Sequence, residues 1–346
     1  MRVSQVLCAA GPVDAVTNQA FAWRRKFDGW GWSGADYAAR LAPRFRSAEL
    51  KDLGELAPAA DEVVLVHYSG YAAGLDRVAA STERMLLLSH NITPSRYFWA
   101  TDPVTAGVCE LGREQLAQLG MRAGAAAGVS EFNARELEAL SGRPAQAIPV
   151  LFEPAPIPRD AVAQDGPPAV LFVGRLAPHK RQDLVIAAFA RYRRTAPGAQ
   201  LTLVGSPATE EFGAWLRELA DRLAPGAVRF ETEISGARLA SHYAWADVFL
   251  CLSEHEGFCI PLLEAFHSGV PVLARGAGAI TEVVGDAGIV LGAGDDAATA
   301  AEAVRLVVED GELRAELRAR GARRLEHYDA GRAAEQLRAA ITELAA

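Results

Sequence analysis

The sequence predicts an α/β protein with two doubly wound parallel sheets. Short apolar runs alternate with helical patterns from the start of the chain, and this alternation is typical of a parallel sheet covered by helices. After a proline-rich stretch the same pattern begins again at Ala169. Because half of the 346 residues are hydrophobic, each half of the chain can bury a core of its own. We therefore expect two Rossmann-like domains.

The first domain is expected to cover residues 1–150. Its apolar runs are short enough for buried strands, and a helical pattern follows the first of them. The expected strands are residues 3–9, 62–67, 85–89 and 125–129, and the expected helix is residues 18–28.

Residues 151–168 are interpreted as a linker between the domains. Prolines are too dense around this stretch for a helix or for the interior of a sheet. They are Pro149, Pro154, Pro156, Pro158, Pro167 and Pro168.

The second domain is expected to cover residues 169–328. Strands are predicted at 169–173, 200–204, 228–230 and 247–252, and helices at 182–194 and 210–223. The tail from Ala300 onward reads as helical, with breaks near Gly311 and Tyr328. Residues 329–346 form the last of these helical segments.

Composition limits the classes of function. The chain has 35 basic and 43 acidic residues, a net charge of -8, which argues against nucleic acid as a partner. Its four cysteines lack C-x-x-C spacing and are expected to be reduced thiols. No apolar stretch approaches the ~20 residues that span a bilayer. We therefore expect a cytoplasmic protein, with peripheral membrane contact through an amphipathic face left open.

The most informative segment is residues 253–265, where two glutamates flank a predicted strand-to-helix turn. Glu256 lies on the loop, and Glu264 follows inside a helix whose first turn holds Pro261. Gly257 lets the backbone pass close to a ligand and offer N–H groups beside the positive helix end. Carboxylates so placed can accept hydrogen bonds from sugar hydroxyls. The alternative is that both glutamates are solvated residues near a helix terminus.

A second segment presents cations at the carboxyl edge of the same sheet. The strand 170–173 leads into Gly174, Arg175 and Lys180, and ligands of open α/β sheets bind at that edge. A guanidinium fork and a mobile ammonium together suit a diphosphate. The alternative is an ordinary surface cluster of Arg175, Lys180 and Arg181.

Both segments resemble those of one enzyme family. Residues 253–265, together with 268–274, resemble the donor-site signature of retaining glycosyltransferases of family 4, which have the GT-B fold of two Rossmann-like domains facing each other across a crevice. The G-R-L-x-x-x-K pattern from Gly174 to Lys180 is similar to that family's diphosphate-binding motif. One departure is Cys259, because the family usually has glycine there.

The resemblance implies a role for each donor-site residue. Arg175 and Lys180 would stabilise the leaving diphosphate, and Glu264 would bind the ribose. Glu256 would bind the hexose with the backbone of Gly257, Phe258, Cys259 and Ile260. The nucleobase would lie near Ile234, although the segment at Glu233 and Ile234 lacks the usual glycine. The helix at 329–346 would pack back on the first domain.

The acceptor side is predicted in the first domain. His67 and His90 each end a predicted strand and are expected to face the crevice. The segment from His90 and Asn91 through Pro94 resembles a family 4 subgroup in which this histidine lies across from the donor sugar. Gly11, in the first loop, resembles the opening of that subgroup and would approach the diphosphate or the acceptor. A structural role remains the alternative for His67.

The sequence thus predicts a retaining hexosyltransferase that uses a nucleoside diphosphate sugar and a glycan, lipid-linked or small-molecule acceptor. No paired-aspartate motif of the metal-dependent kind is evident, so neither a metal nor another cofactor is expected. Two alternatives remain: a non-catalytic sugar-nucleotide-binding module and a phosphorylase-like GT-B enzyme with pyridoxal phosphate. A dehydrogenase is disfavoured because no G-x-G-x-x-G follows either first strand.

Overall fold

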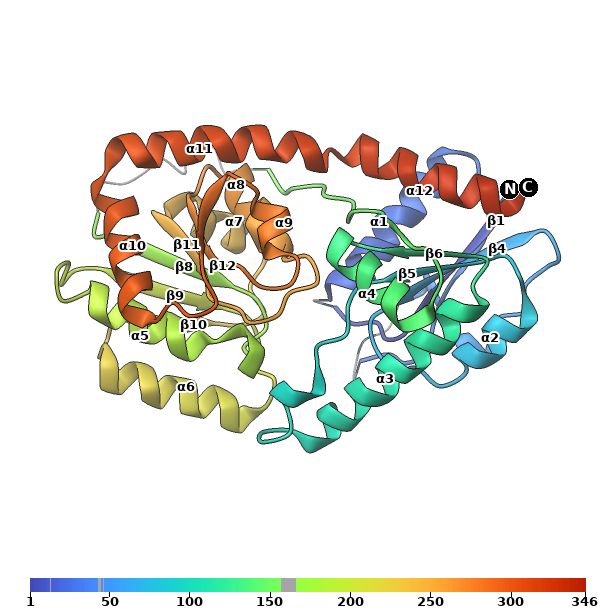
Figure 1. The fold of residues 1–346 in the computed structure, drawn as a ribbon, viewed down its shortest axis with the longest axis horizontal. Helices are drawn as coiled ribbons and strands as arrows, with labels where there is room; N and C mark the ends of the chain where they lie inside the picture. Colours follow the sequence, from blue (N-terminus) through green and yellow to red (C-terminus); the bar gives the residue numbers. More distant parts are fainter. Residues whose placement is uncertain (13, 43–44, 46, 157–165) are drawn as a thin grey trace. The chain divides into compact units, whose positions relative to one another are not determined.

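The computed structural model describes residues 1–12, 14–42, 45, 47–156 and 166–346 (Figure 1). The chain divides into two compact units. The N-terminal unit comprises Met1–Leu151 and Tyr328–Ala346, and the C-terminal unit comprises Phe152–His327. Half of the predicted linker, residues 157–165, lies outside the described residues.

The N-terminal unit holds a seven-stranded parallel sheet in the order β3-β2-β1-β4-β5-β6-β7. Its strands are β1 (Arg2–Leu7), β2 (Asp36–Ala38), β3 (Leu50–Asp52), β4 (Glu62–Tyr68), β5 (Met85–Ser89), β6 (Ala125–Gly128) and β7 (Gln146–Ala147). Its helices are α1 (Ala15–Gly29), α2 (Leu75–Ser81), α3 (Pro103–Arg122), α4 (Glu131–Ser141) and α12 (Ala330–Ala345), with 3-10 turns η1 (Leu53–Glu55), η2 (Ser95–Tyr97) and η4 (Glu326–Tyr328). Every residue of β4 and β5 is buried, as expected for central strands covered on both faces.

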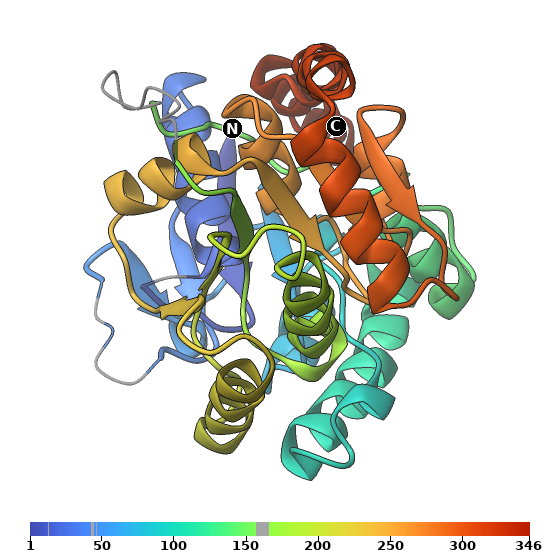
Figure 2. The same cartoon turned by 90° about the vertical axis from the view of Figure 1, so that its left-hand side faces the viewer.

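The C-terminal unit repeats this topology with six parallel strands in the order β10-β9-β8-β11-β12-β13. Its strands are β8 (Ala169–Val173), β9 (Gln200–Val204), β10 (Val228–Glu231), β11 (Val248–Cys251), β12 (Val272–Arg275) and β13 (Gly288–Leu291). Its helices are α5 (Gln182–Tyr192), α6 (Glu210–Leu223), α7 (Gly236–Trp245), α8 (Ile260–His267), α9 (Ile280–Val284), α10 (Ala297–Glu309) and α11 (Gly311–Leu325), with the 3-10 turn η3 (Pro178–Lys180). Helices α5 and α10 pack against each other (Figure 2).

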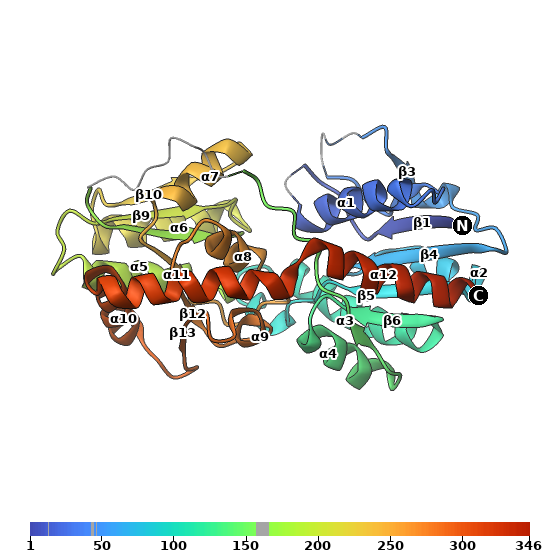
Figure 3. The same ribbon diagram turned by 90° about the horizontal axis from the view of Figure 1, so that it is seen from above.

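The last helix, α12, is part of the N-terminal unit and contacts β4 and β5 (Figure 3). The Arg338 guanidinium lies 5.4 Å from the centre of the Trp30 ring, which belongs to an aromatic cluster with Phe27 and Trp32. Trp23 packs against the same phenylalanine and is 1% exposed. Its role is therefore packing within the core of this unit.

Several expected elements agree with the structure and others differ at their ends. The strands at 85–89, 169–173 and 200–204 and the helix at 210–223 have the expected bounds. Helix α1 begins at Ala15 rather than at residue 18, because the Asp14 carboxylate caps it by accepting a 2.7 Å hydrogen bond from the Thr17 N–H. The short strands β2 and β3 were not predicted, since three residues carry too little periodicity to be recognised.

Both sheets change winding direction beside their first strands, at β1/β4 and at β8/β11. In open α/β sheets, ligands bind outside the carboxyl ends of the strands at this switch point. The loops after β8 and β11 carry Arg175, Lys180 and Glu256, and His67 lies near the carboxyl end of β4. The topology thus places these residues where a ligand site is expected in each unit.

None of the helices in the described part of the chain combines the length and the apolar character that crossing a membrane requires.

Candidate functional site

The loop after β8 presents Arg175 and Lys180 differently. The Arg175 side chain is exposed, and its guanidinium makes no hydrogen bond or ion pair within the described ranges. Lys180 ends the turn η3 and its side chain is 19% exposed. The buried Gln182 side chain holds the loop by two hydrogen bonds. It donates to the Arg175 carbonyl at 3.1 Å and accepts from the Ala177 N–H at 3.3 Å.

Lys180 and Glu256, which lie on different loops, form an ion pair. The Lys180 Nζ donates to Glu256 Oε2 at 2.5 Å, and the Ser253 hydroxyl donates to Glu256 Oε1 at 2.8 Å. Burial disfavours the ammonium of Lys180, but the adjacent Glu256 carboxylate holds its pKa above the ordinary value. The two loops at the β8/β11 switch point are thereby joined through charged side chains.

A third loop supports the backbone of Glu256. The Glu256 carbonyl accepts a 2.9 Å hydrogen bond from the Ala279 N–H. Gly278 has a φ of +56°, and a Cβ there would lie 2.2 Å from the Glu256 carbonyl oxygen. Only glycine fits this close approach, so the loop after β12 fixes the position of the glutamate.

Helix α8 begins directly after Cys259, which has a left-handed φ of +72°. Pro261 lies in the first turn, as predicted, and the side chain of Cys259 makes no capping hydrogen bond. A left-handed residue explains why glycine suits this position in the resembled family. The backbone of Glu233 is also left-handed, with a φ of +53°. Glu233 and Ile234 form the second segment in which the family usually has a glycine.

Glu264 lies within α8 and is held by a tyrosine of α7. The Tyr243 hydroxyl donates to Glu264 Oε2 at 2.7 Å. Burial raises the pKa of Glu264, and the hydrogen bond from Tyr243 only partly opposes this effect. The other carboxylate oxygen, Oε1, accepts no hydrogen bond from the described residues and can accept one from a ligand.

In the N-terminal unit, His67 and His90 are joined in a hydrogen-bonded chain with Gln5. His67 Nδ1 lies 3.0 Å from His90 Nε2, and His67 Nε2 lies 2.8 Å from Gln5 Oε1. The Gln5 amide nitrogen donates to the Ala20 carbonyl at 2.9 Å and to Asp36 Oδ1 at 3.0 Å. Both of these partners are acceptors, so the orientation of the amide is fixed.

This chain determines the tautomers of both histidines. Because Gln5 presents its oxygen, His67 must carry its proton on Nε2, and its bare Nδ1 must accept from His90 Nε2–H. His90 is therefore left with Nδ1 as an acceptor. Burial lowers the pKa of His90 to about 4 and, with the neighbouring His90, lowers that of His67 well below its ordinary value. Both rings are neutral at pH 7.

The other two predicted residues of this unit, Gly11 and Asn91, lie in the loops after β1 and β5. The Gly11 N–H donates to the Thr17 hydroxyl at 3.1 Å, so it is engaged within the loop that precedes α1. Asn91 follows His90 with a left-handed φ of +87°, a conformation that asparagine tolerates better than most residues.

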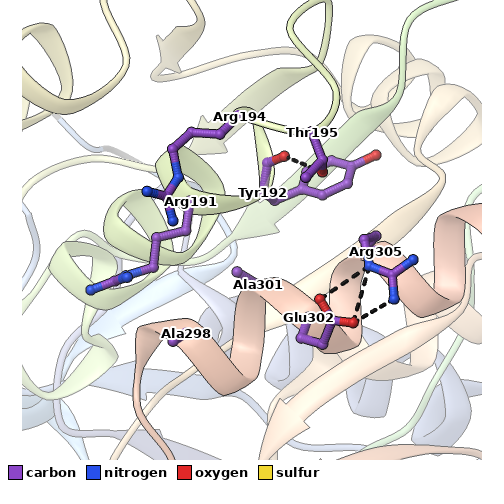
Figure 4. A pocket seen from close by; sticks show the side chains of 8 residues that line it. All are labelled: Arg191, Tyr192, Arg194, Thr195, Ala298, Ala301, Glu302 and Arg305. Carbon is purple, nitrogen blue, oxygen red and sulfur yellow. Dashed lines mark hydrogen bonds and ion pairs between the residues drawn. The ribbon is translucent and has the colours of Figure 1, made fainter.

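A pocket lies between α5 and α10 of the C-terminal unit (Figure 4). Helix α5 returns across the sheet after β8, so its last turn lies at the edge opposite the Lys180 loop. Arg305, on the other wall, is paired with Glu302 and Glu309. The pocket is lined by Arg191, Tyr192, Arg194, Thr195, Ala298, Ala301, Glu302 and Arg305. It takes no part in the candidate site.

Sequence reasoning missed two residues that hold predicted site residues in place. Tyr243 supports Glu264 from a helix that had no recognisable motif. Gln5 orients His67, and a polar residue inside the apolar run 3–9 was the available signal.

Comparison with known proteins relates the C-terminal unit to a broad enzyme family. Residues 156–324 match the family model described as "Glycosyl transferases group 1". This match supports the broad glycosyltransferase relationship that the motifs predicted, and it covers the segment that carries Arg175, Lys180, Glu256 and Glu264.

Curated relatives that match part of the chain are also named as glycosyltransferases. A GDP-mannose-dependent alpha-mannosyltransferase of Mycolicibacterium smegmatis is 41% identical over 120 residues, which is 35% of this chain and 28% of the relative. A D-inositol 3-phosphate glycosyltransferase of Kineococcus radiotolerans is 32% identical over 205 residues, or 53% of this chain and 47% of the relative. The matched part thus spans less than half the length of either relative.

Solved structures confirm the predicted GT-B fold. Sucrose-phosphate synthase from Thermosynechococcus elongatus has a TM-score of 0.78 at 19% identity, over 99% of this chain and 98% of that one. Anabaena Alr3699/HepE in complex with UDP-glucose has a TM-score of 0.78 at 17% identity, over 99% of both chains.

Proposed function

We propose that this protein is a retaining glycosyltransferase that moves a hexose from a nucleoside diphosphate sugar to an acceptor hydroxyl. The observation that carries the proposal is the junction of Lys180, Glu256 and Ser253 at the β8/β11 switch point. It places an ammonium and a fixed carboxylate beside the start of α8, where the Cys259 side chain makes no capping hydrogen bond. Such a site suits a ligand with both an anionic diphosphate and a sugar.

Charge stabilisation of the leaving group is assigned to Lys180 and Arg175. A diphosphate gains negative charge as its bond to the sugar breaks, and preorganised cations lower the barrier to that step. Lys180 is held in place by Glu256, whereas the exposed Arg175 guanidinium is available to a ligand. These cations and the helix end can neutralise the diphosphate, so we propose that the reaction needs no metal ion.

Recognition of the donor is divided between the two glutamates. Glu264 has one oxygen fixed by Tyr243, and the other is proposed to accept from the ribose hydroxyls. Glu256 is proposed to bind the hexose together with the backbone from Gly257 to Ile260. The segment at Ile234 is proposed to contact the nucleobase.

His90 is proposed to act on the transferred sugar as a neutral hydrogen-bond acceptor. Its Nδ1 is the acceptor that the chain from Gln5 through His67 leaves unoccupied, and a sugar hydroxyl can donate to it. Asn91 and His67 would then help to shape the acceptor side. Retention of configuration would follow if the departing phosphate oxygen takes the proton of the acceptor on the same face of the sugar.

The direct test is a transfer assay with UDP-, GDP-, ADP- and dTDP-hexoses and a panel of glycan, lipid-linked and small-molecule acceptors. A thermal-shift screen should first identify the donor, since a ligand at a hundred times its dissociation constant adds roughly 2.7 kcal/mol of stability. NMR of the product then reports the anomeric configuration. Stabilisation by a sugar nucleotide without transfer to any acceptor would instead favour a non-catalytic binding module, and an inverted product would reject the retaining mechanism.

A further inference from the structure

Two cysteines and a glutamate converge at the candidate donor site. Cys251 is the last residue of β11 and is 1% exposed, whereas Cys259 immediately precedes α8 and is partly exposed. Their sulfur atoms and a carboxylate oxygen of Glu256 all lie within 4.8 Å of one another. Cys259 follows Cys251 by eight residues in the sequence and has a left-handed backbone.

This arrangement has the ligand types and spacing of a zinc site. With Zn–S bonds of ~2.3 Å, a tetrahedral ion holds its ligand atoms roughly 3.7 Å apart. Small movements of the three side chains would bring their ligand atoms from the observed separations to these distances. Two thiolates and a carboxylate provide three protein ligands and leave a fourth position open, as zinc sites with an exchangeable ligand do.

The surrounding charges also favour a divalent ion. The two thiolates and the Glu256 carboxylate carry three negative charges, which Zn²⁺ and the Lys180 ammonium together balance. The Ser253 hydroxyl lies 3.3 Å from the Cys251 sulfur and 2.8 Å from Glu256 Oε1. Such outer contacts orient metal ligands.

We propose that Cys251, Glu256 and Cys259 form a binding site for a thiophilic divalent cation of the Zn²⁺ class. Metal in this site occupies Glu256 and the start of α8, and it therefore excludes the hexose of the donor. Only this inhibitory consequence rests on the proposed function, because binding of the cation requires the three side chains alone. The site would make transfer sensitive to zinc, although the reaction itself uses no metal.

The binding test uses Co²⁺ and Zn²⁺ on the full chain with a phosphine reductant that keeps the thiols reduced. Wild type should take up one ion, with near-ultraviolet absorption from thiolate-to-Co²⁺ charge transfer. Cys251→Ala should lower Zn²⁺ affinity in calorimetry by at least ~100-fold, because losing even an outer partner of a metal site costs 10–100-fold.

Cys8→Ala is the matched control, since Cys8 is a buried cysteine of the N-terminal unit. It should bind Zn²⁺ as wild type does. Cys251→Ser, which preserves volume and a contact with Ser253, repeats the test if Cys251→Ala folds poorly by circular dichroism. Unchanged Zn²⁺ affinity in a folded Cys251 variant, or no thiolate absorption in wild type with Co²⁺, would overturn the site.

Inhibition is measured separately, with each variant compared with its own transfer rate without zinc. Zn²⁺ should compete with the sugar nucleotide in wild type and Cys8→Ala, and much less in the Cys251 variants. If no transfer is found at all, the proposed function fails while the metal titration still decides the site. If transfer occurs but Zn²⁺ does not bind, the site fails and the function stands.

Discussion

The Lys180 ammonium lies 2.5 Å from Glu256 Oε2, so the residue assigned to the diphosphate and the one assigned to the hexose are ion-paired in the structure. Glu256 is 6% exposed and also accepts from Ser253. The pair positions Lys180 before any ligand binds, and preorganised charge is more effective than charge that must move. A substitution at either residue therefore also removes the ion-pair partner of the other.

Lys180→Ala is expected to lower turnover by about two orders of magnitude or more, the scale of losing one preorganised stabilising group. Lys180→Arg should recover only part of this rate, because a planar guanidinium cannot repeat the contacts of a compact ammonium. Steady-state kinetics on folded proteins provides the measurement. Wild-type turnover in Lys180→Ala would reject a role on the leaving group.

Stability should respond to the same pair in a non-additive way. Removing Lys180 leaves the Glu256 carboxylate without its counter-charge, at a cost of up to ~3 kcal/mol for a largely buried pair. The double variant Lys180→Ala/Glu256→Gln removes that charge, so it should recover part of the stability but none of the turnover. Urea unfolding of the two single variants and the double variant tests this coupling. Additive losses would show that the pair does not form in solution.

Glu264→Gln and Glu256→Gln should affect ligand binding differently. Glu264→Gln should weaken both the bare nucleoside diphosphate and the full sugar nucleotide by ~1–3 kcal/mol, because a charge-assisted bond to the ribose is lost. Glu256→Gln should leave affinity for the bare diphosphate nearly intact while reducing transfer. Calorimetry with both ligands measures the difference. Equal losses of diphosphate affinity would contradict the separate roles.

Transfer should survive treatment with excess chelator. The proposed leaving-group stabilisation comes from Arg175, Lys180 and the start of α8, all of which chelation leaves unchanged. A transfer assay after dialysis against chelator, with and without added magnesium or manganese, makes the comparison. Complete loss of activity that either metal restores would mean that the diphosphate site has been misinterpreted.

Acid should destabilise the N-terminal unit through His90, whose ring is partly buried. The pKa of His90 is lowered from 6.5 to about 4 by burial, so the unfolded chain binds its proton more readily. Stability from the neutral ring is fully present above pH 6.5 and is lost as pH falls through 4, by on the order of 3 kcal/mol. Unfolding measured between pH 7 and 4 should therefore be less pH-dependent in His90→Gln. Equal pH dependence in the two proteins would show that His90 titrates normally.

The hydrogen-bonded chain from Gln5 predicts which nitrogen carries the proton in each ring. Long-range ¹H–¹⁵N spectra at pH 7 should show both His67 and His90 protonated on Nε2. Gln5→Leu removes the acceptor that fixes His67, so the spectra of that variant should show mixed tautomers. A wild-type His90 protonated on Nδ1 would instead make it a donor to the sugar and reverse its assigned role.

The sequence by itself determined the two-domain α/β organisation and the positions of the loops that carry the proposed donor-site residues. Apolar runs such as 85–89 and 169–173 reveal buried parallel strands because both faces of such strands are covered. Glu256 and Glu264 were recognised because the turn and helix that hold them are contiguous in sequence. The sequence pattern predicted those features whose physical cause lies within a few neighbouring residues.

The tertiary structure decided which side chains touch. Lys180 and Glu256 are 76 positions apart, and Gln5 and His67 are 62 apart. Parallel strand pairing at β8/β11 and β1/β4 brings these distant residues together, and no local propensity encodes that pairing. The tautomers of the two histidines follow from the same cause, because burial and hydrogen-bond partners exist only once the sheets have formed.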